Sequence, residues 1–319
     1  MARTLARSLR DSEWKALLRT DVDSHDRDLQ ALTADGRAIA GLAKSVASAN
    51  RDILALKGLP ASTGSLLRVR LAAPGMAAQL DAGASPWVAV ASPDERSGML
   101  TAYDERGEAH SLDPERVPDR PVYLLDLDVS RAHRVGFGLV DKELAMQGLR
   151  VPSAAEGGWW GTTVTAIGLK EDQEPWYKGE AEAFALVTGF GPDGTVRVYS
   201  VDMPYLAEAG AEYHPNQMVV NWSHYKYDLV DVVMMEDDDG TDYKGLAEAL
   251  TEILLTVTDQ GGYVPLVKAL FEAMPDAWFT DGPDRLDSWY SLSKSAEVRL
   301  EGASGNGWMT VEPRFVEEL

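Results

Sequence analysis

The chain contains no cysteine. Thiolates are the nucleophiles of cysteine enzymes and the ligands of zinc–thiolate sites, so both kinds of site are excluded together with disulfides. The absence does not identify a compartment, because a secreted protein of this size does not require disulfides. With 319 residues, 45% of them hydrophobic, the chain is long enough for two domains that each bury a core.

Basic residues are scarce, above all in the second half. The whole chain has 30 Lys and Arg against 51 Asp and Glu, which gives a net charge of -21. Residues 151–319 contain 30 of the acidic residues but only 10 of the basic ones. A surface of this sign repels nucleic-acid backbones and anionic lipids, so we expect no nucleic-acid partner.

Long apolar runs and common catalytic signatures are also missing. No run approaches the roughly twenty apolar residues of a membrane span, so direct membrane insertion is not expected. The first residues lead into an amphipathic pattern without the apolar stretch of a signal peptide. No His-Glu-x-x-His pair, Gly-x-Ser-x-Gly elbow or phosphate-binding glycine loop is present. Of the five scattered histidines, His214 and His224 flank a predicted hairpin, where a structural role is expected.

The patterns that are present change along the chain. Residues 2–58 are predicted to be helical, because apolar residues recur at helical spacing and Asp11 or Ser12 offers an N-cap. Residues 66–127 are predicted to form short strands and turns, and residues 151–158 a linker. We expect strands at residues 86–91, 99–103 and 122–125, and a short helix at residues 138–148.

Strand-like segments of the second half end in acidic sequence. Residues 164–169 alternate and are β-branched, and residues 181–188 are predicted to be their hairpin partner across a carboxylate-rich connection. A further segment ends at Asp202, and the apolar run 229–235 ends in four consecutive acids before Gly240. Clustered carboxylates repel one another and suit a hard cation such as Ca²⁺, which takes about six to eight oxygens. The predicted metal ligands are Glu171, Asp172, Glu174, Asp237, Asp238, Asp239 and Asp242.

The spacing of these acids excludes an EF-hand. An EF-hand loop has Gly at its sixth position, and placing Gly240 there puts Met235 at the first position and Leu246 at the twelfth. What remains is a loop site at one end of a β-sandwich, and residues 239–245 resemble the acidic calcium loop of C2-like domains. The alternative is a solvated acidic rim without an ion.

Asp126 and Asp128 suggest a second hypothesis. Residues 124–129 resemble the first motif of the haloacid-dehalogenase phosphatases, in which a buried strand presents one Asp as nucleophile and a second as general acid. Residues 234–242 would then bind magnesium, and Lys178 would neutralise the phosphate. That motif normally opens its domain and is followed by βα repeats, whereas about a hundred residues precede it here. Alternatively, both Asp side chains accept hydrogen bonds at a strand end.

Four segments of the second half carry a family resemblance. They are residues 174–182, 213–217, 232–238 and 306–313. They resemble an uncharacterised family of exported bacterial proteins, domain of unknown function 3103, over most of the chain. The resemblance implies export, so we expect that a signal peptide was removed. It implies no activity and no catalytic residues.

Together these features predict an α+β protein. Residues 1–150 are expected to form a helical segment and a small mixed α/β region, and residues 159–319 an acidic antiparallel β-sandwich with a helical hairpin inserted at residues 245–275. Seven of the nine tryptophans lie in the second half, where they fill a core or form a ligand surface. We expect a secreted, calcium-stabilised binding or scaffolding protein with an extracellular carbohydrate or protein ligand. The alternative is a magnesium-dependent phosphohydrolase.

Overall fold

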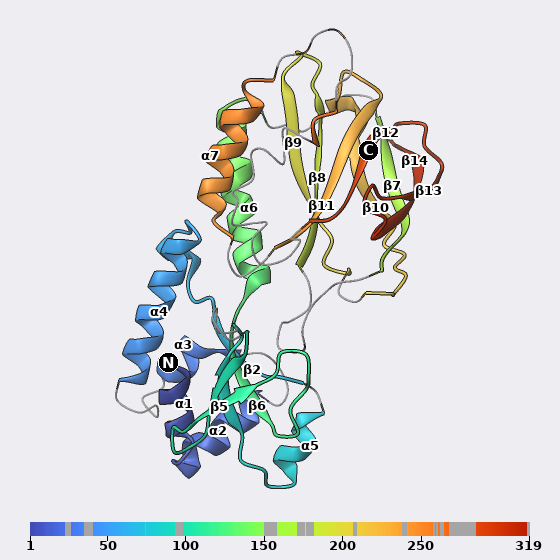
Figure 1. The fold of residues 1–319 in the computed structure, drawn as a ribbon. Helices are drawn as coiled ribbons and strands as arrows, with labels where there is room; N and C mark the ends of the chain where they lie inside the picture. The colour runs from blue at the N-terminus through green and yellow to red at the C-terminus, as the bar shows by residue number, and fades with distance from the viewer. Residues whose placement is uncertain are drawn as a thin grey trace. The chain divides into compact units, whose positions relative to one another are not determined.

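The structure is a computed structural model of the chain, shown as a ribbon in Figure 1. Contacts within the chain divide it into two compact units, which we name the N-terminal unit and the C-terminal unit. The N-terminal unit comprises Met1–Leu56, Pro60–Ala132 and Glu174–Gly179, and the C-terminal unit comprises Lys57–Leu59, His133–Gln173 and Glu180–Leu319. The structure describes residues 1–22, 27–34, 41–73, 75–92, 98–149, 158–170, 176, 182–206, 209–237, 241–257, 259, 261, 265–267 and 285–317.

Helices form most of the first part of the N-terminal unit, as predicted. They are α1 (Ala2–Ser8), α2 (Ser12–Val22), α3 (Leu29–Ala34) and α4 (Leu42–Leu56), followed by the 3-10 turn η1 (Ala61–Thr63) and by α5 (Met76–Asp81). Asp11 caps α2, because its Oδ1 accepts the N–H groups of Glu13 at 3.0 Å and Trp14 at 2.9 Å. No helix among the described residues is long and apolar enough to cross a membrane.

Six strands form the sheet of the N-terminal unit. They are β1 (Arg27–Asp28), β2 (Leu67–Leu71), β3 (Trp87–Val90), β4 (Leu100–Tyr103), β5 (Ala109–Leu112) and β6 (Val122–Leu127), in the order β1-β2-β6-β3-β4-β5. The central strand β6 runs antiparallel to β2 and parallel to β3. Its Tyr123 and Leu125 pack against the leucines of the helices, and its Leu124 packs on the opposite face with Met76 of α5. Burial on both faces explains the unbroken apolar sequence of β6.

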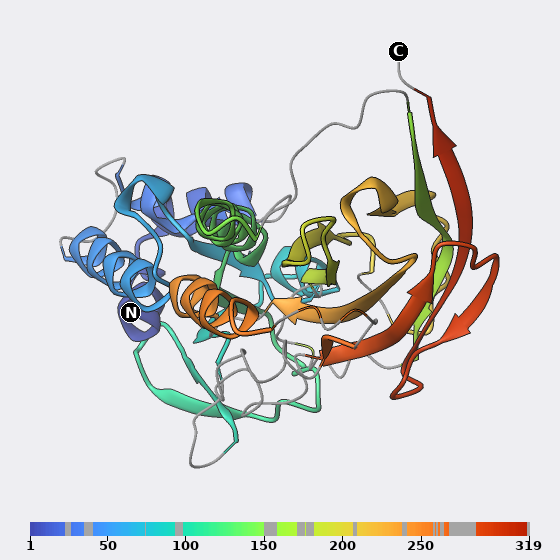
Figure 2. The same ribbon diagram turned by 90° about the horizontal axis from the view of Figure 1, so that it is seen from above.

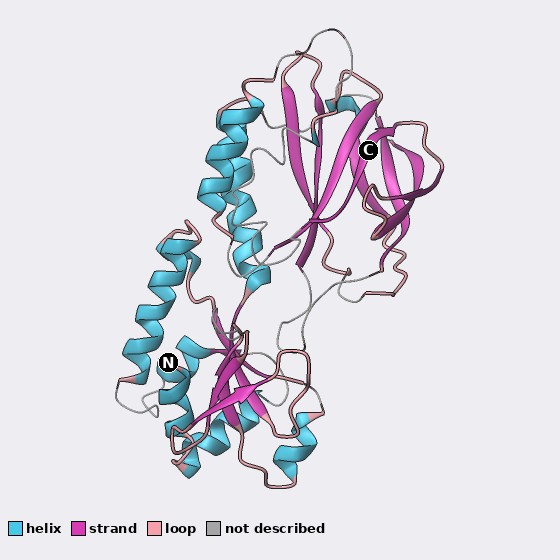
Figure 3. Cartoon of the chain, viewed as in Figure 1, coloured by secondary structure: helices cyan, strands magenta, loops and turns pink. Residues whose placement is uncertain are grey.

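Two four-stranded sheets form the sandwich of the C-terminal unit, which confirms the predicted architecture (Figure 3). Sheet I has the order β10 (Gln217–Asn221), β7 (Trp159–Leu169), β14 (Gly307–Val316), β13 (Val298–Glu301). Sheet II has the order β12 (Arg285–Ser293), β11 (Leu229–Asp237), β8 (Glu182–Phe190), β9 (Val196–Asp202). Alternate side chains of both sheets, such as Val164 and Met309 of sheet I and Val232 of sheet II, share one core.

Helices α6 (Val129–Met146) and α7 (Tyr243–Leu254) lie beside each other against the face of sheet II that points away from sheet I (Figures 1 and 2). Phe137 of α6 contacts Phe184 of β8, with ring centroids 4.5 Å apart. The side chains of β8 are buried on both faces of sheet II from Ala183 to Phe190. The C-terminal unit therefore has three layers, which are the helices, sheet II and sheet I.

Strand pairing differs from the sequence prediction in one respect. Residues 164–169 and 181–188 do not form a hairpin, because β7 pairs with β10 and β14 whereas β8 pairs with β9 and β11. The pairing of β7 with β14 extends from Trp159 to Leu169 and joins segments that lie far apart in the sequence. Both segments are strands, so the local pattern was correct and only the partner was wrong.

Two boundaries also differ from the prediction. The helix expected at residues 138–148 begins at Val129, and Asp128 caps it by accepting the N–H of Arg131 at 3.0 Å. Residues 285–289, for which no strand was predicted, belong to β12. The first inserted helix is present as α7, but most of the second lies outside the described residues, as do residues 151–157 of the expected linker.

Candidate functional site

Acidic strand ends meet at one end of sheet II. Asp237 is the last residue of β11 and stands opposite Glu182, the first residue of β8. Asp202 is the last residue of β9 and stands opposite Phe184, also near the start of β8. The fold thus brings together two of the acidic strand ends that the sequence analysis singled out.

A histidine of α6 lies between these two carboxylates. The Nδ1 atom of His133 is 2.8 Å from Oδ2 of Asp237, and its Nε2 atom is 2.9 Å from Oδ1 of Asp202. The side chain of Asp237 is only 1% exposed, whereas that of Asp202 is 54% exposed. The imidazole therefore links a buried carboxylate to one in contact with solvent.

The two carboxylates determine the protonation of His133. Burial alone would lower the pKa of the imidazole, since it penalises the charged form. Hydrogen bonds and charge from Asp237, and then from Asp202, outweigh burial and raise the pKa of His133 above the usual value of 6.5. The protonated imidazole neutralises part of the negative charge at this end of the sheet.

Tyr243 and Lys57 complete the buried group, which we name the His133 site. The Tyr243 hydroxyl donates a hydrogen bond to Oδ2 of Asp237. The ammonium group of Lys57 lies 5.6 Å from the centroid of the Tyr243 ring, and this lysine is only 2% exposed. Oδ1 of Asp237 is buried and has no hydrogen-bond partner among the described residues.

The His133 site joins two helices to two strands of sheet II. His133 comes from α6, Tyr243 from the first turn of α7, and the two carboxylates from β9 and β11. Buried charges are tolerated only when they are paired, and here one imidazole serves both carboxylates. The site therefore fastens both helices to sheet II. Chemically it is a hydrogen-bonded ionic network in which Oδ1 of Asp237 has no hydrogen-bond partner among the described residues.

Of the seven predicted metal ligands, the structure describes Asp237 and Asp242. Asp242 caps α7, because its Oδ1 accepts the N–H groups of Lys244 and Gly245, both at 3.1 Å. In the part of the chain that the structure describes, no group of three or more His, Cys, Asp or Glu side chains is arranged to hold a metal ion. The calcium site stays a prediction. Glu171, Asp172, Glu174, Asp238 and Asp239 lie outside the described residues.

Asp126 and Asp128 lie in the N-terminal unit. Asp126 is buried at the end of β6, where its Oδ2 accepts a hydrogen bond from Nε of Arg70 at 2.6 Å and lies 3.7 Å from Nη2 of Arg68. Asp128 has the capping role at α6 described above. Lys178 lies outside the described residues. These contacts give both Asp side chains a structural role, and none of them favours the phosphohydrolase hypothesis.

Sequence reasoning missed His133. It considered His214 and His224, of which His214 is exposed and lies 3.2 Å from Glu212, while burial lowers the pKa of His224. His133 is separated along the chain by 69 residues from Asp202 and by 104 from Asp237. No local motif joins residues at such separations, and only the packing of α6 on sheet II brings them together.

Comparison with known proteins identifies a family but no activity. No curated protein and no solved structure matches the chain. One family model, described as a protein of unknown function (DUF3103), matches residues 1–318. This match extends over both the N-terminal and the C-terminal unit, and the chain therefore belongs to the DUF3103 family.

Proposed function

We propose that the protein is an exported, calcium-stabilised binding or scaffolding protein whose ion binds at the acidic end of sheet II. The observation that carries this proposal is the pairing of Asp237 with Glu182. Because β8 and β11 are neighbours, the acidic segment that precedes β8 and the one that follows β11 join the same end of the sheet. Neighbouring strands are only about 5 Å apart, so the chain enters β8 and leaves β11 at nearly the same place.

The charges of these segments favour a hard cation. Glu171 and Asp172 lie in the segment between β7 and β8, about ten residues before β8 begins, and Asp238 and Asp239 directly follow β11 in the sequence. Carboxylates that gather at one end of a sheet repel one another, and water screens the repulsion only in part. Calcium accepts about six to eight oxygen ligands in flexible geometry, which suits acids from two loops.

Asp237 gives independent support. Its Oδ2 is engaged by both His133 and Tyr243, whereas its buried Oδ1 has no hydrogen-bond partner among the described residues. An unsatisfied buried acceptor costs about 1–3 kcal/mol, and more when it is charged. A cation bound beside Oδ1 would remove that cost. The proposed calcium loop is of the C2-like kind. The proposal also includes export, and cell fractionation tests it by showing whether the protein is found outside the cells.

Calorimetric titration tests the ion directly. We expect saturable binding of Ca²⁺ and weaker binding of Mg²⁺, because Mg²⁺ requires a stricter octahedral geometry. The double variant Asp238→Asn with Asp239→Asn should weaken calcium binding about tenfold or more, since it removes two anionic ligands. Glu248→Gln is the matched control, because Glu248 is an exposed acid of α7 that lies 3.7 Å from Lys244. Equal binding by both variants would refute the site.

A further inference from the structure

We propose that a groove along the edge of β12 binds a neutral saccharide. This inference rests on the binding function proposed above and names its ligand class. The groove has a volume of about 370 Å³, near the lower end of the roughly 300–1,000 Å³ of small-molecule sites. It lies entirely within the C-terminal unit.

The groove lies between the edges of the two sheets. One wall is formed by residues 288–293, which are consecutive in β12, the edge strand of sheet II. The opposite wall includes Leu300 and Glu301 of β13, the edge strand of sheet I. An edge strand exposes backbone and side chains that a central strand would hide, so a ligand can reach both.

Two apolar residues of the groove belong to the packed core of the sandwich. Trp289 and Leu292 belong to the core shared by the two sheets and are 4% and 2% exposed. The Trp289 indole donates its N–H to the carbonyl of Leu300 at 3.3 Å, which ties the two walls together. A ligand would therefore meet a preformed surface.

A β-bulge shapes the rim. Val230 pairs with Leu292 and Val232 pairs with Trp289, so two residues of β12 stand opposite the single residue Asp231. The bulge holds Ser291 at a φ of 55°, a conformation that costs a non-glycine residue about 1 kcal/mol or more.

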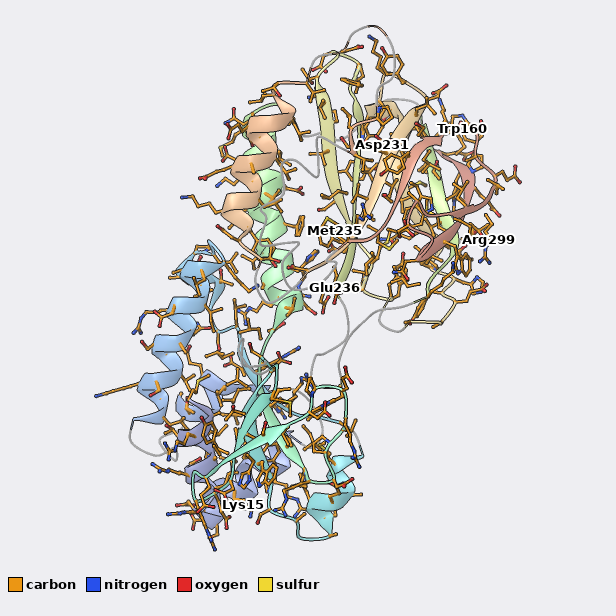
Figure 4. The ribbon with its side chains drawn as sticks, viewed as in Figure 1. Lys15, Trp160, Asp231, Met235, Glu236 and Arg299 are labelled. Atoms are coloured by element: carbon orange, nitrogen blue, oxygen red, sulfur yellow. The ribbon has the colours of Figure 1, made fainter. Side chains whose placement is uncertain are left out.

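The strained bulge is held in place from the core. Asp231, labelled in Figure 4, is fully buried in β11, and its Oδ1 accepts the N–H of Ser291 at 2.8 Å. Its Oδ2 accepts the N–H of Leu266. Bulges of this kind re-aim a side chain, and here Tyr290, which follows the buried Trp289, is 48% exposed. The fold thus maintains a strained backbone that presents an aromatic ring at the rim of the groove.

The lining indicates the class of ligand. An exposed tyrosine ring offers a face for the apolar side of a sugar, and Ser291 and Ser293, which line the same groove, carry hydroxyl groups that can hydrogen-bond to a ligand. Among the described lining residues there is no cationic side chain, and Glu301 adds a carboxylate. Together with the acidic surface of this half of the chain, that disfavours phosphates and acidic sugars. A neutral, polyhydroxylated ring compound fits best.

Titration of the full chain with neutral trisaccharides tests this inference. The probes are maltotriose, cellotriose, xylotriose and triacetylchitotriose, and binding is followed by calorimetry in the presence of calcium. At least one probe should bind saturably, and Tyr290→Ala should weaken that binding about tenfold or more, because the stacking face is lost. Tyr290→Phe is the matched control, since it keeps the ring and should stay within about threefold of the unaltered protein.

The possible outcomes separate this inference from the proposed function. Absence of binding to all four probes, or binding that Tyr290→Ala leaves unchanged, overturns the saccharide site. Binding of an extended peptide library in place of the sugars, abolished by Tyr290→Ala, also overturns it and assigns the groove to strand addition. Calcium binding measured on the same samples reports separately on the ion site, which Tyr290→Ala should not affect.

Discussion

At the scale of single residues, Gly136 lies where α6 meets the ring of Tyr243. A Cβ atom at this position would lie 2.2 Å from the ring. We expect Gly136→Ala to lower the free energy of unfolding by about 1–3 kcal/mol in denaturant titrations, because either the ring or the helix must move. Gly138→Ala, two residues further along α6, places its methyl group in open space. That control should leave stability unchanged or raise it by up to about 1 kcal/mol, and equal losses in both variants would contradict the packing described.

His133 makes stability depend on pH. Its pKa is raised in the folded protein, so its charged form stabilises the fold fully below pH 6.5, and this contribution is lost as the pH rises through the folded pKa. The difference in melting temperature between the unaltered protein and His133→Gln should therefore shrink between about pH 6 and pH 9. His214→Gln, at an exposed histidine, is the control and should show no such trend. A difference that stays constant over this range would contradict the ionic network.

Residue-level reasoning found part of the candidate site. It identified Asp202 and Asp237 as acids at strand ends, because an apolar run followed by acids is a local pattern. It did not find His133, Tyr243 or Lys57, whose relation to the acids depends on the packing of two helices on sheet II. Long-range polar networks have no sequence period, so only the fold reveals them.

At the scale of elements, Asp287 holds the turn that joins β13 to β14. Its buried carboxylate accepts N–H groups from Ser288 at 2.7 Å, Ser304 at 2.8 Å and Gly307 at 2.7 Å. Asp287→Asn replaces one acceptor oxygen by a donor, so we expect a loss of about 2–3 kcal/mol in the free energy of unfolding. Asp228→Asn, which alters a largely exposed ion pair with Lys294, should cost under about 1 kcal/mol. Similar losses for both variants would contradict this role of Asp287.

The sequence predicted most elements of the fold because their signals are local. The alternation of β7, the apolar run of β11 and the cap of α2 are all readable within about ten residues. The pairing of β7 with β14 was missed, because register and partner depend on which faces are buried together rather than on neighbouring sequence. β12 was missed because the polar residues Asp287 and Ser288 interrupt its apolar pattern, and both are buried by hydrogen bonding.

At the scale of the whole molecule, the division between the units falls within α6, between Ala132 and His133. Most of α6 therefore belongs to the C-terminal unit, where it covers Phe184 and its neighbours on sheet II. We expect a fragment of residues 129–319 to unfold cooperatively in thermal melts. A fragment of residues 159–319 should bind a hydrophobic dye and aggregate, because it leaves one face of sheet II uncovered. Equal stability of the two fragments would show that α6 is not part of this unit.

The most direct test of the proposed function is the melting temperature of the full chain in excess chelator, in calcium and in magnesium. An ion that binds only the folded state stabilises it by about 2.7 kcal/mol at a hundred times its Kd. For a domain the size of the C-terminal unit, each kcal/mol of added stability raises the melting temperature by about 2–4 °C. The proposal predicts that millimolar calcium raises the melting temperature by several degrees, that magnesium raises it less, and that Asp239→Asn reduces the calcium effect. An identical melting curve in all three solutions would contradict the ion site and leave the acidic segments as a solvated rim.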